Sequence, residues 1–413
     1  MNKFIFFFCF APLWVYAKLE EKVYSKKIKS IQFYIYSVNN DKQSLNTPNF
    51  KIGSDLDLKV EFDWIDKNPI YGFECKIIHC NRNWEKSNLL ENQFTNEINQ
   101  VMSYHVENSI TFGLNYFHCS SNIPKPSLSG NYMLQVTEID NPDNILFTRK
   151  FLAYENKVYI KEKEYSATNY QKNKQSIDFE VTLGKNYPFD FQDFTHVSMR
   201  KNERWDLQKE LNQANSINPF DHSLSYNANF NNNKFDAGNE YITLDISDFS
   251  YKGIADKLLK QEDTSLFILS AYIHFRNSYY NYFDIDGKFY TANYNEEEGD
   301  VHSEYVKVKF ILDYKLETKD EVFVIGAFNN WECNQTNKLI FNPSTRMYEK
   351  TIWLKQGYYN YKFIAKNSHE KKESFFMGDF IQTTNTYDII IYYYDQLLDT
   401  DKIIGFKNIR FPN

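Results

Sequence analysis

Apolar and polar residues alternate along most of this chain, and the alternation predicts β-strands. Four segments of the N-terminal third place apolar residues at every second position: "SIQFYIYSV" (30–38), "LDLKVEFDWI" (56–65), "FECKIIHC" (73–80) and "GNYMLQVTEID" (130–140). This pattern is typical of strands with one buried face and one face in water. Clusters of turn-forming residues such as Asn141-Pro142-Asp143 separate the segments, so the region is expected to fold as a sandwich of two sheets.

The same pattern continues to the C-terminus. After a charged stretch near Asn156, further strands are expected at 176–183, 194–206, 239–247 and 265–276. The acidic run "NEEEGD" (295–300) is interpreted as a solvated connection, and the strands at 304–312, 348–366 and 387–395 follow it. We therefore predict an all-β fold of three tandem β-sandwich domains, immunoglobulin-like or early-set-like. Their expected ranges are an N-terminal sandwich at 18–156, a middle β-rich domain at 157–300 and a C-terminal early-set-like sandwich at 301–413.

The first 17 residues, "MNKFIFFFCFAPLWVYA", have a different character. A lysine precedes an apolar run, and the run ends at a small residue, Ala17. This order is typical of a cleaved signal peptide. Because the run is too short to span a bilayer and the strongest later run, "YDIIIYYY", has the length of a strand, we expect export without stable membrane insertion.

Composition and charge narrow the classes further. The chain of 413 residues contains 32 Tyr and 36 Phe, which suit half-buried strands. Its net charge of −7 argues against nucleic acid as a partner. Outside the signal peptide the cysteines are Cys75, Cys80, Cys119 and Cys333. An exported chain can form disulfides, so a bridge to Cys119 is our preferred prediction, with free buried thiols as the alternative.

Two dipeptides raise the question of a metal. His79-Cys80 and His118-Cys119 carry ligand types that zinc prefers. Adjacent residues in a strand point to opposite faces, so neither dipeptide can readily give both ligands to one ion. "FDIDGKFY" (283–290) resembles the start of a calcium loop but lacks its further ligand and glycine, and Asp286-Gly287 is better explained as a tight turn.

Signatures of catalysis are also missing from the sequence. It contains no HExxH, GxSxG or nucleotide-binding glycine motif. We therefore predict a protein that is not an enzyme, with no catalytic residue, no cofactor and no metal site. A metal-dependent hydrolase ranks last among the function classes considered.

The segment "VFVIGAFNNWECN" (322–334) places Asn329, Asn330 and Trp331 in a loop after a strand, with "LKQGYYNYKF" (354–363) further on. Together these resemble the glycogen-binding and early-set modules of glucan-active enzymes. The resemblance implies that Trp331 and Lys362 hold a glycan. The second tryptophan of those modules is missing here, and a structural role for Trp331, closing the end of a sandwich, is the favoured explanation.

A second resemblance extends over nearly the whole chain. The segments "HCNRNW" (79–84), "SGNYMLQV" (129–136), "LFTRKF" (146–151), "KNERWD" (201–206), "AGNEYITLDI" (237–246), "DIDGKF" (284–289), "LKQGYYNYKF" and "DKIIGF" (401–406) follow one another in this order. In these segments and their order the chain is similar to the plug proteins of the type IX secretion system. One departure is "KNER", where the family tends toward Gln-Asn-Gly-Arg.

This resemblance implies a periplasmic protein on the inner side of the outer membrane. Such a protein seals the periplasmic opening of the outer-membrane translocon barrel and catalyses nothing. The candidate recognition loops are "KNERWD" (Asn202, Arg204, Trp205, Asp206) and "FNNW" (Asn329, Asn330, Trp331), although burial in turns and core is the favoured explanation of both segments. A periplasmic glycan-binding module that uses Trp331 and Lys362 is the alternative function.

Overall fold

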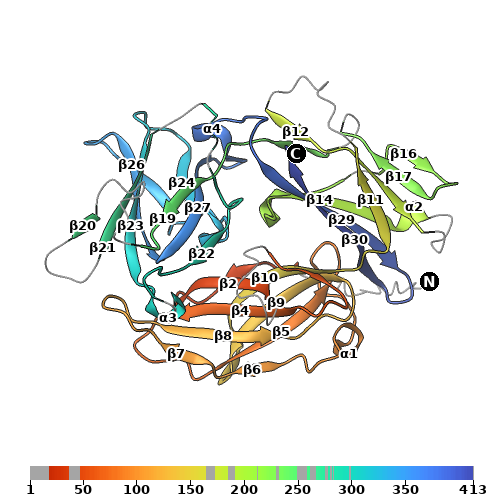
Figure 1. Ribbon diagram of the computed structural model, residues 1–413, viewed down its shortest axis with the longest axis horizontal. Coiled ribbons are helices and arrows are strands. Elements are labelled where there is room, and N and C mark those ends of the chain that lie inside the picture. Colours follow the sequence, from red (N-terminus) through yellow and green to blue (C-terminus); the bar gives the residue numbers. More distant parts are fainter. Residues whose placement is uncertain are drawn as a thin grey trace, which may run out of the picture.

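The computed structural model shows three β-rich units packed around a common centre (Figure 1). It describes residues 18–36, 47–163, 173–184, 191–211, 213–228, 232–248, 258–260, 267–274, 278–279, 281, 283–296 and 299–412. The expected signal peptide lies outside these residues. Within them, no helix has both the length and the apolar character needed to cross a membrane.

The first unit, called here the first sandwich, consists of two sheets. One sheet has the order β1 (Lys22–Val23), β10 (Asn141–Tyr154), β9 (Gly130–Glu138), β5 (Phe73–Cys80) and β6 (Val101–Ser103), and β3 (Asn49–Lys51) also pairs with β10. The other has the order β2 (Ile28–Tyr36), β4 (Asp57–Trp64), β8 (Phe117–Ile123) and β7 (Val106–Asn108). A short helix, α1 (Glu91–Phe94), precedes β6. Alternate residues of the facing strands, such as Val60, Phe62 and Ile77, form the core between the sheets.

The second unit, called the middle unit, is also a sandwich. One of its four-stranded sheets has the order β11 (Val158–Glu162), β13 (Phe179–Leu183), β17 (Ser223–Tyr226) and β16 (Ser216–Asn218). The other four-stranded sheet has the order β15 (Gln208–Glu210), β14 (Thr195–Lys201), β29 (Asn385–Asp395) and β30 (Thr400–Phe411). The pair β12 (Lys174–Ser176) and β18 (Lys234–Asp236) and the short helices α2 (Phe191–Phe194) and η1 (Trp205–Leu207) complete it.

The third unit is one sheet of ten strands whose two ends share a core. Its order is β19 (Ile242–Asp245), β27 (Gly357–Lys366), β24 (Glu321–Ile325), β25 (Lys338–Asn342), β26 (Met347–Lys355), β23 (Tyr305–Asp313), β21 (Phe267–His274), β20 (Leu258–Lys260), and both β22 (Phe289–Thr291) and β28 (Lys371–Lys372) pair with β27. Three short helices lie in its connections: α3 (Gly299–His302), η2 (Ala327–Asn329) and α4 (Ser374–Met377). Leu244 of β19 and Phe310 of β23 belong to the same buried cluster, so the sheet closes over itself.

The all-β class and the sandwich architecture expected from the sequence are confirmed. Strand pairing, however, does not follow the expected division at residue 300. The segment 387–395 lies in β29, which pairs with β14 of the middle unit, while β21 and β22 pair with strands of the third unit. These pairings are long-range, and the period of a single strand carries no information about its neighbour in the sheet.

Burial on both faces explains the uninterrupted apolar run of β29. Tyr387, Ile389 and Ile391 enter the core of the middle unit. Ile390 and Tyr392 point to the other face, into a second apolar cluster with Trp84 and other residues of the first sandwich. The run therefore contributes to a domain core and to a domain interface at the same time.

The expected bridge to Cys119 is not formed. Cys75, Cys80 and Cys119 are buried free thiols, and Cys333 is a partly buried one. Burial raises the pKa of the Cys75 thiol to about 12, as it does for Cys80. These side chains serve as small apolar core residues, which was the alternative prediction.

Candidate functional site at the junction of the three units

The "KNERWD" segment forms a tight turn between β14 and η1, at the centre of the molecule. Asn202 and Glu203 both have positive φ angles, 49° and 57°. The Asn202 side chain stabilises this turn because its amide donates to the Tyr241 hydroxyl (3.0 Å) and its oxygen accepts from the Thr386 amide (2.8 Å). An asparagine tolerates this left-handed geometry better than most residues. The turn is thereby fixed to the middle and third units.

Arg204 is the most heavily paired residue of the turn. Its guanidinium donates to both oxygens of Asp206 (3.0 and 2.8 Å) and to both oxygens of Glu373. Burial alone raises the pKa of the Glu373 carboxyl, but nearby Arg204 and Lys362 outweigh burial and lower this pKa to about 2. Glu373 is therefore ionised at neutral pH, as a charge-assisted pair with Arg204 requires.

The "FNNW" loop meets this turn from the third unit. The Asn329 side chain accepts from the Gly326 amide (3.0 Å) and donates to the Val324 carbonyl (3.0 Å), which closes the short helix η2. Asn330 then adopts the left-handed conformation, and Trp331 turns inward. The Arg204 guanidinium lies 3.9 Å from the centroid of the Trp331 ring, so the two loops contact each other directly.

Trp205 links the same turn to the first sandwich. Its ring lies edge-on against Trp84, with 4.9 Å between centroids. Arg200 lies 3.9 Å from the Trp205 ring, and Lys150 lies 4.5 Å from the Trp84 ring. The "HCNRNW" and "KNERWD" segments, which are far apart in the sequence, therefore meet at an interface of alternating cations and aromatic rings.

Most residues of the two candidate recognition loops are not exposed. Asn202, Arg204 and Trp331 are 5%, 2% and 8% exposed, and Trp205, Asn329 and Asn330 are half-buried. Asp206 alone among the seven is exposed, and it still pairs with Arg204. The favoured explanation, burial in turns and core, describes these residues.

The arrangement also argues against the proposed glycan platform. Trp331 contacts Arg204 and the ring of Tyr241, and so presents no open face on which a sugar could stack. Lys362 is 3% exposed, and its ammonium lies 4.2 Å from the Tyr241 ring. Trp331 is buried because the loop that is exposed in glycan-binding modules is covered here by the middle unit.

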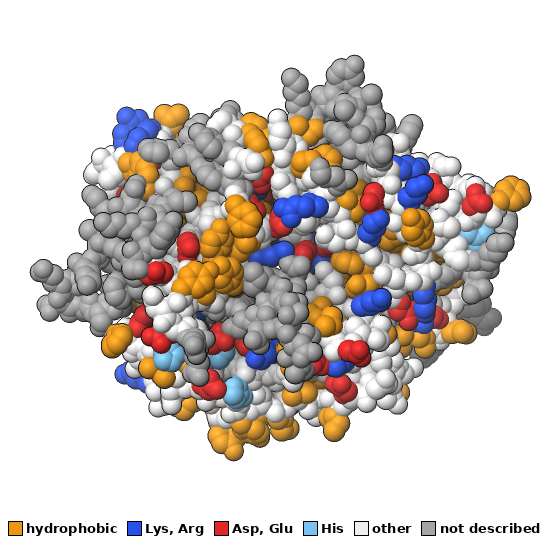
Figure 2. Space-filling view, viewed as in Figure 1, with side chains coloured by type: hydrophobic (Ala, Val, Ile, Leu, Met, Phe, Trp, Pro, Cys, Tyr) orange, Lys and Arg blue, Asp and Glu red, His pale blue; other side chains and the backbone are white. Residues whose placement is uncertain are grey.

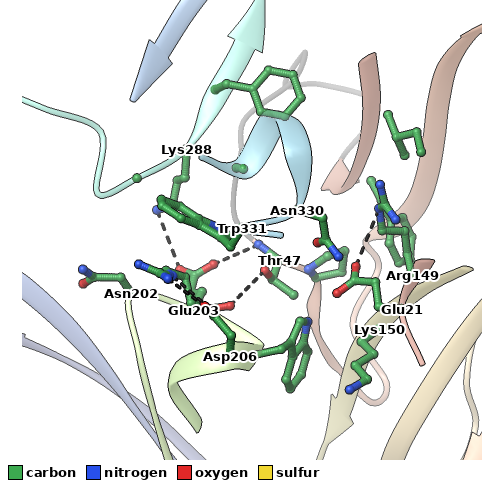
Figure 3. A pocket seen from close by; sticks show the side chains of 18 of the residues that line it. Glu21, Thr47, Arg149, Lys150, Asn202, Glu203, Asp206, Lys288, Asn330 and Trp331 are labelled. Carbon is green, nitrogen blue, oxygen red and sulfur yellow. Dashed lines mark hydrogen bonds and ion pairs between the residues drawn. The ribbon is translucent and has the colours of Figure 1, made fainter. Parts of the chain in front are cut away.

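A cavity of about 450 Å³ lies where the three units meet (Figure 3). Residues 31–34 of the first sandwich, 202–206 of the middle unit and 286–289 of the third unit all line it. Asp286 and Gly287 form the tight turn expected there, with φ angles of 54° and 87°. The strand that follows this turn, β22, pairs with β27 of the third unit. The sequence therefore predicted the Asp286-Gly287 turn, but it could not predict that this turn and the other loops line one cavity.

Glu203 is the carboxylate most deeply placed in this cavity. The Thr47 amide donates to it (2.8 Å), and the Lys288 ammonium lies 3.7 Å away (Figure 3). Burial raises the pKa of Glu203 to about 7, and the charge of nearby Asp388 adds to this effect against the opposing influence of Lys288. Glu203 therefore changes its charge near neutral pH, at the contact of three units.

Two further ion pairs, one of them fully buried, were not identified from the sequence. Arg200, fully buried, donates to Asp388 (2.9 and 2.7 Å) and to the Asn49 side chain (3.0 Å). Arg149 of β10 lies 3.6 Å from Glu21, which precedes the neighbouring strand β1, and both residues are partly buried. The segment "HVSMRK" (196–201) mixes polar and apolar residues, so the sequence carried no signal that could have indicated the burial of Arg200.

The chemistry of this site is pairing of charges. Acids and bases face each other across the unit boundaries, and the rings fill the space between them. Such an arrangement holds domains in one relative position, because separating them would expose apolar rings and leave buried charges without partners.

Comparison with known proteins identifies the first sandwich. Residues 28–155 match the family model described as the Type 9 secretion system plug protein 1st domain, which confirms the resemblance expected from the sequence motifs. A crystal structure of a hypothetical protein from Parabacteroides merdae is similar to the whole chain, with a TM-score of 0.86 and 24% identity. The similarity covers 95% of this chain and 100% of that one, and it shows the fold. No curated protein matches the chain.

Proposed function

We propose, from the plug-domain match of residues 28–155, that the protein is a non-catalytic periplasmic plug. In this proposal it docks on the outer-membrane translocon of the type IX secretion system and seals its periplasmic opening. The family match is the observation that carries the proposal. It gives the chain a role related to type IX secretion; docking and sealing are the further step.

The construction of the molecule supports a sealing role. A chain of this length has a radius of gyration of roughly 21 Å when compact, so it can obstruct a wide pore by bulk. A seal must also resist deformation. Arg204 pairs with Glu373 of the third unit, and Arg200 donates to the Asn49 side chain of the first sandwich, so the three units can act as one obstacle.

The first sandwich carries a candidate docking surface. Tyr71, Met102 and Tyr104 are 69%, 55% and 56% exposed, and the two tyrosine rings lie 5.6 Å apart. They surround β6, which is the edge strand of its sheet. Figure 2 shows apolar side chains along this lower rim of the molecule. An apolar edge within the domain that matches the plug family suits pairing with another protein through β-strand addition.

Co-purification tests the proposal. The translocon would be isolated through an affinity tag from cells that express this protein and from cells that lack it. We expect the plug to be retained stoichiometrically in the first preparation, because an idle pore needs its seal. If translocon prepared without secretion substrate never carries the protein, the proposed docking is wrong.

A further inference from the structure

A second polar cluster lies away from the central cavity, where the third unit covers the first sandwich. Glu61 and Asp63 are two residues apart in β4 and therefore point to the same face. His118 of β8 lies opposite Asp63 in the register of the two strands. The alternation predicts that this face lies in water, but it packs against α3 and β26 of the third unit.

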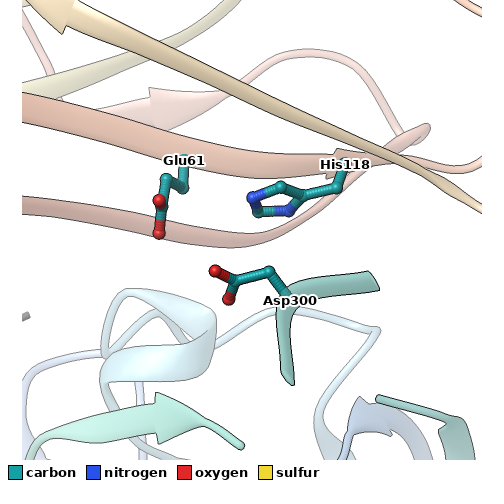
Figure 4. Close-up of side chains that lie close together, drawn as sticks. All are labelled: Glu61, His118 and Asp300. Atoms are coloured by element: carbon teal, nitrogen blue, oxygen red, sulfur yellow. The ribbon is translucent and has the colours of Figure 1, made fainter. Parts of the chain in front are cut away.

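Three potential metal ligands converge on this interface (Figure 4). One ligand atom each from Glu61, His118 and Asp300 lies within 4.8 Å of the other two. Glu61 is 3% exposed and His118 is 6% exposed, while Asp300 is half-buried in α3. An imidazole nitrogen with two carboxylate oxygens is a donor set suited to Zn²⁺ and similar transition-metal ions, with water completing the coordination.

Asp63 supplies an independent reason to regard this cluster as a ligand set. Its carboxylate lies 2.9 Å from Nδ1 of His118, which assigns the ligand role to Nε2. A carboxylate on the far nitrogen is the usual way in which a metal-binding histidine is oriented. Asp63 is itself fixed, because it accepts from the Tyr305 hydroxyl (2.7 Å) and from the Lys355 ammonium (2.8 and 3.1 Å).

The charges around the cluster agree with a divalent cation. Lys355 pairs with Asp63 and also donates to the Asp300 carbonyl (2.6 Å), so its charge is already balanced by Asp63. Lys59 lies 2.8 Å from Glu61 and is 29% exposed, and it can turn to solvent when a cation takes its place. The carboxylates of Glu61 and Asp300 would then neutralise the two charges of the ion.

We propose that Glu61, His118 and Asp300 bind one divalent transition-metal ion of the Zn²⁺ type. Two ligands come from the first sandwich and the third comes from the third unit, so the ion crosslinks the two units. The acidic run at 295–300 was expected to be only a solvated connection, and Asp300 gives its last residue a binding role. His118 contributes without its neighbour Cys119, which points into the core.

Zinc binding by the purified full chain tests this proposal. After treatment with a chelator, the protein would be titrated with Zn²⁺ by calorimetry, with elemental analysis of the dialysed sample. We expect one ion per chain, and a thermal midpoint that rises with Zn²⁺. In Asp300→Asn, which keeps the shape of the side chain, affinity should fall at least about ten-fold and the rise should disappear.

Two further variants make the result decisive. Glu61→Gln should weaken Zn²⁺ binding as Asp300→Asn does. His105→Asn changes an exposed histidine that pairs only with Glu107 at the surface (3.0 Å), and it should bind like the wild type. Absence of stoichiometric binding in the wild type, or equal affinity in the wild type and Asp300→Asn, would overturn the proposal. The test does not involve the translocon, so its failure would leave the proposed plug function standing.

Discussion

The Arg204 guanidinium lies 3.9 Å from the centre of the Trp331 ring. These residues belong to two loops in different units, and their contact closes the centre of the molecule. Arg204 also binds Glu373, so the stacked pair has a partly buried carboxylate at its side. This junction joins the separate sandwiches into one body.

Arg204→Ala should destabilise the protein by about 3–5 kcal/mol, since it removes a buried guanidinium and leaves the partly buried Glu373 carboxylate without its main partner. Chemical denaturation measures the loss. Arg410→Ala is a matched control, because Arg410 is 63% exposed and pairs with Asp286 only at 3.7 Å. It should cost less than about 1 kcal/mol. Similar losses in both variants would show that the Arg204 pairs contribute little.

Trp331→Ala should reduce stability by about 3–5 kcal/mol, the usual effect of removing a large buried ring. Calorimetric titration of the wild type with a linear glucan should give no heat of binding, because Arg204 and Tyr241 occupy the surroundings of the ring. Saturable glucan binding by the wild type that disappears in a folded Trp331→Phe variant would support the alternative hypothesis of a glycan-binding module.

Stability should depend on Glu203 between about pH 4.5 and pH 7. Burial raises its pKa from 4.5 to about 7, so the folded protein holds this proton more tightly than the unfolded chain. The contribution of Glu203 to stability is therefore fully present below pH 4.5 and is lost as the pH rises through 7. The glutamine of Glu203→Gln cannot titrate. The free energy of unfolding of this variant, relative to that of the wild type, should therefore increase as the pH rises from 5 to 7.5. Parallel pH profiles would contradict the raised pKa.

Replacing Tyr71, Met102 and Tyr104 together by serine should leave stability nearly unchanged, because all three side chains are exposed. Retention on the tagged translocon should fall at least about ten-fold if they form the docking surface. The control is Ile340→Ser with Leu397→Ser, two residues of the other units that are 70% and 96% exposed. Equal retention of the triple variant and the wild type would move the docking surface elsewhere.

Alternation in the sequence was sufficient to predict the all-β class and the position of most strands, including β4 and β5. It tells which residues share a face, and it cannot tell what covers that face. Glu61 and Asp63 were therefore expected in water, although α3 and β26 bury them. Trp331 was correctly favoured as structural, but its partner Arg204 comes from a loop more than a hundred residues away. Contacts of that range depend on how the units pack together.

The tight turns could also be predicted from the sequence, but the junction that they form between the three units could not. Asp286-Gly287 carries a local signal, since few residue pairs accept two positive φ angles. Arg200 and Glu203 have no such signal, because a charged side chain becomes a buried ion pair only when a partner such as Asp388 is brought opposite to it. The loops of the central site could therefore be predicted from the sequence, but the cavity that they enclose could not.

The proposed sealing can be measured as the ion current through the purified translocon in a planar bilayer. With the periplasmic side exposed to this protein, we expect the current through an idle pore to fall to near the level of the bare membrane. Washing the protein away should restore the current. A pore current that is the same with and without saturating protein would show that the protein does not seal the pore.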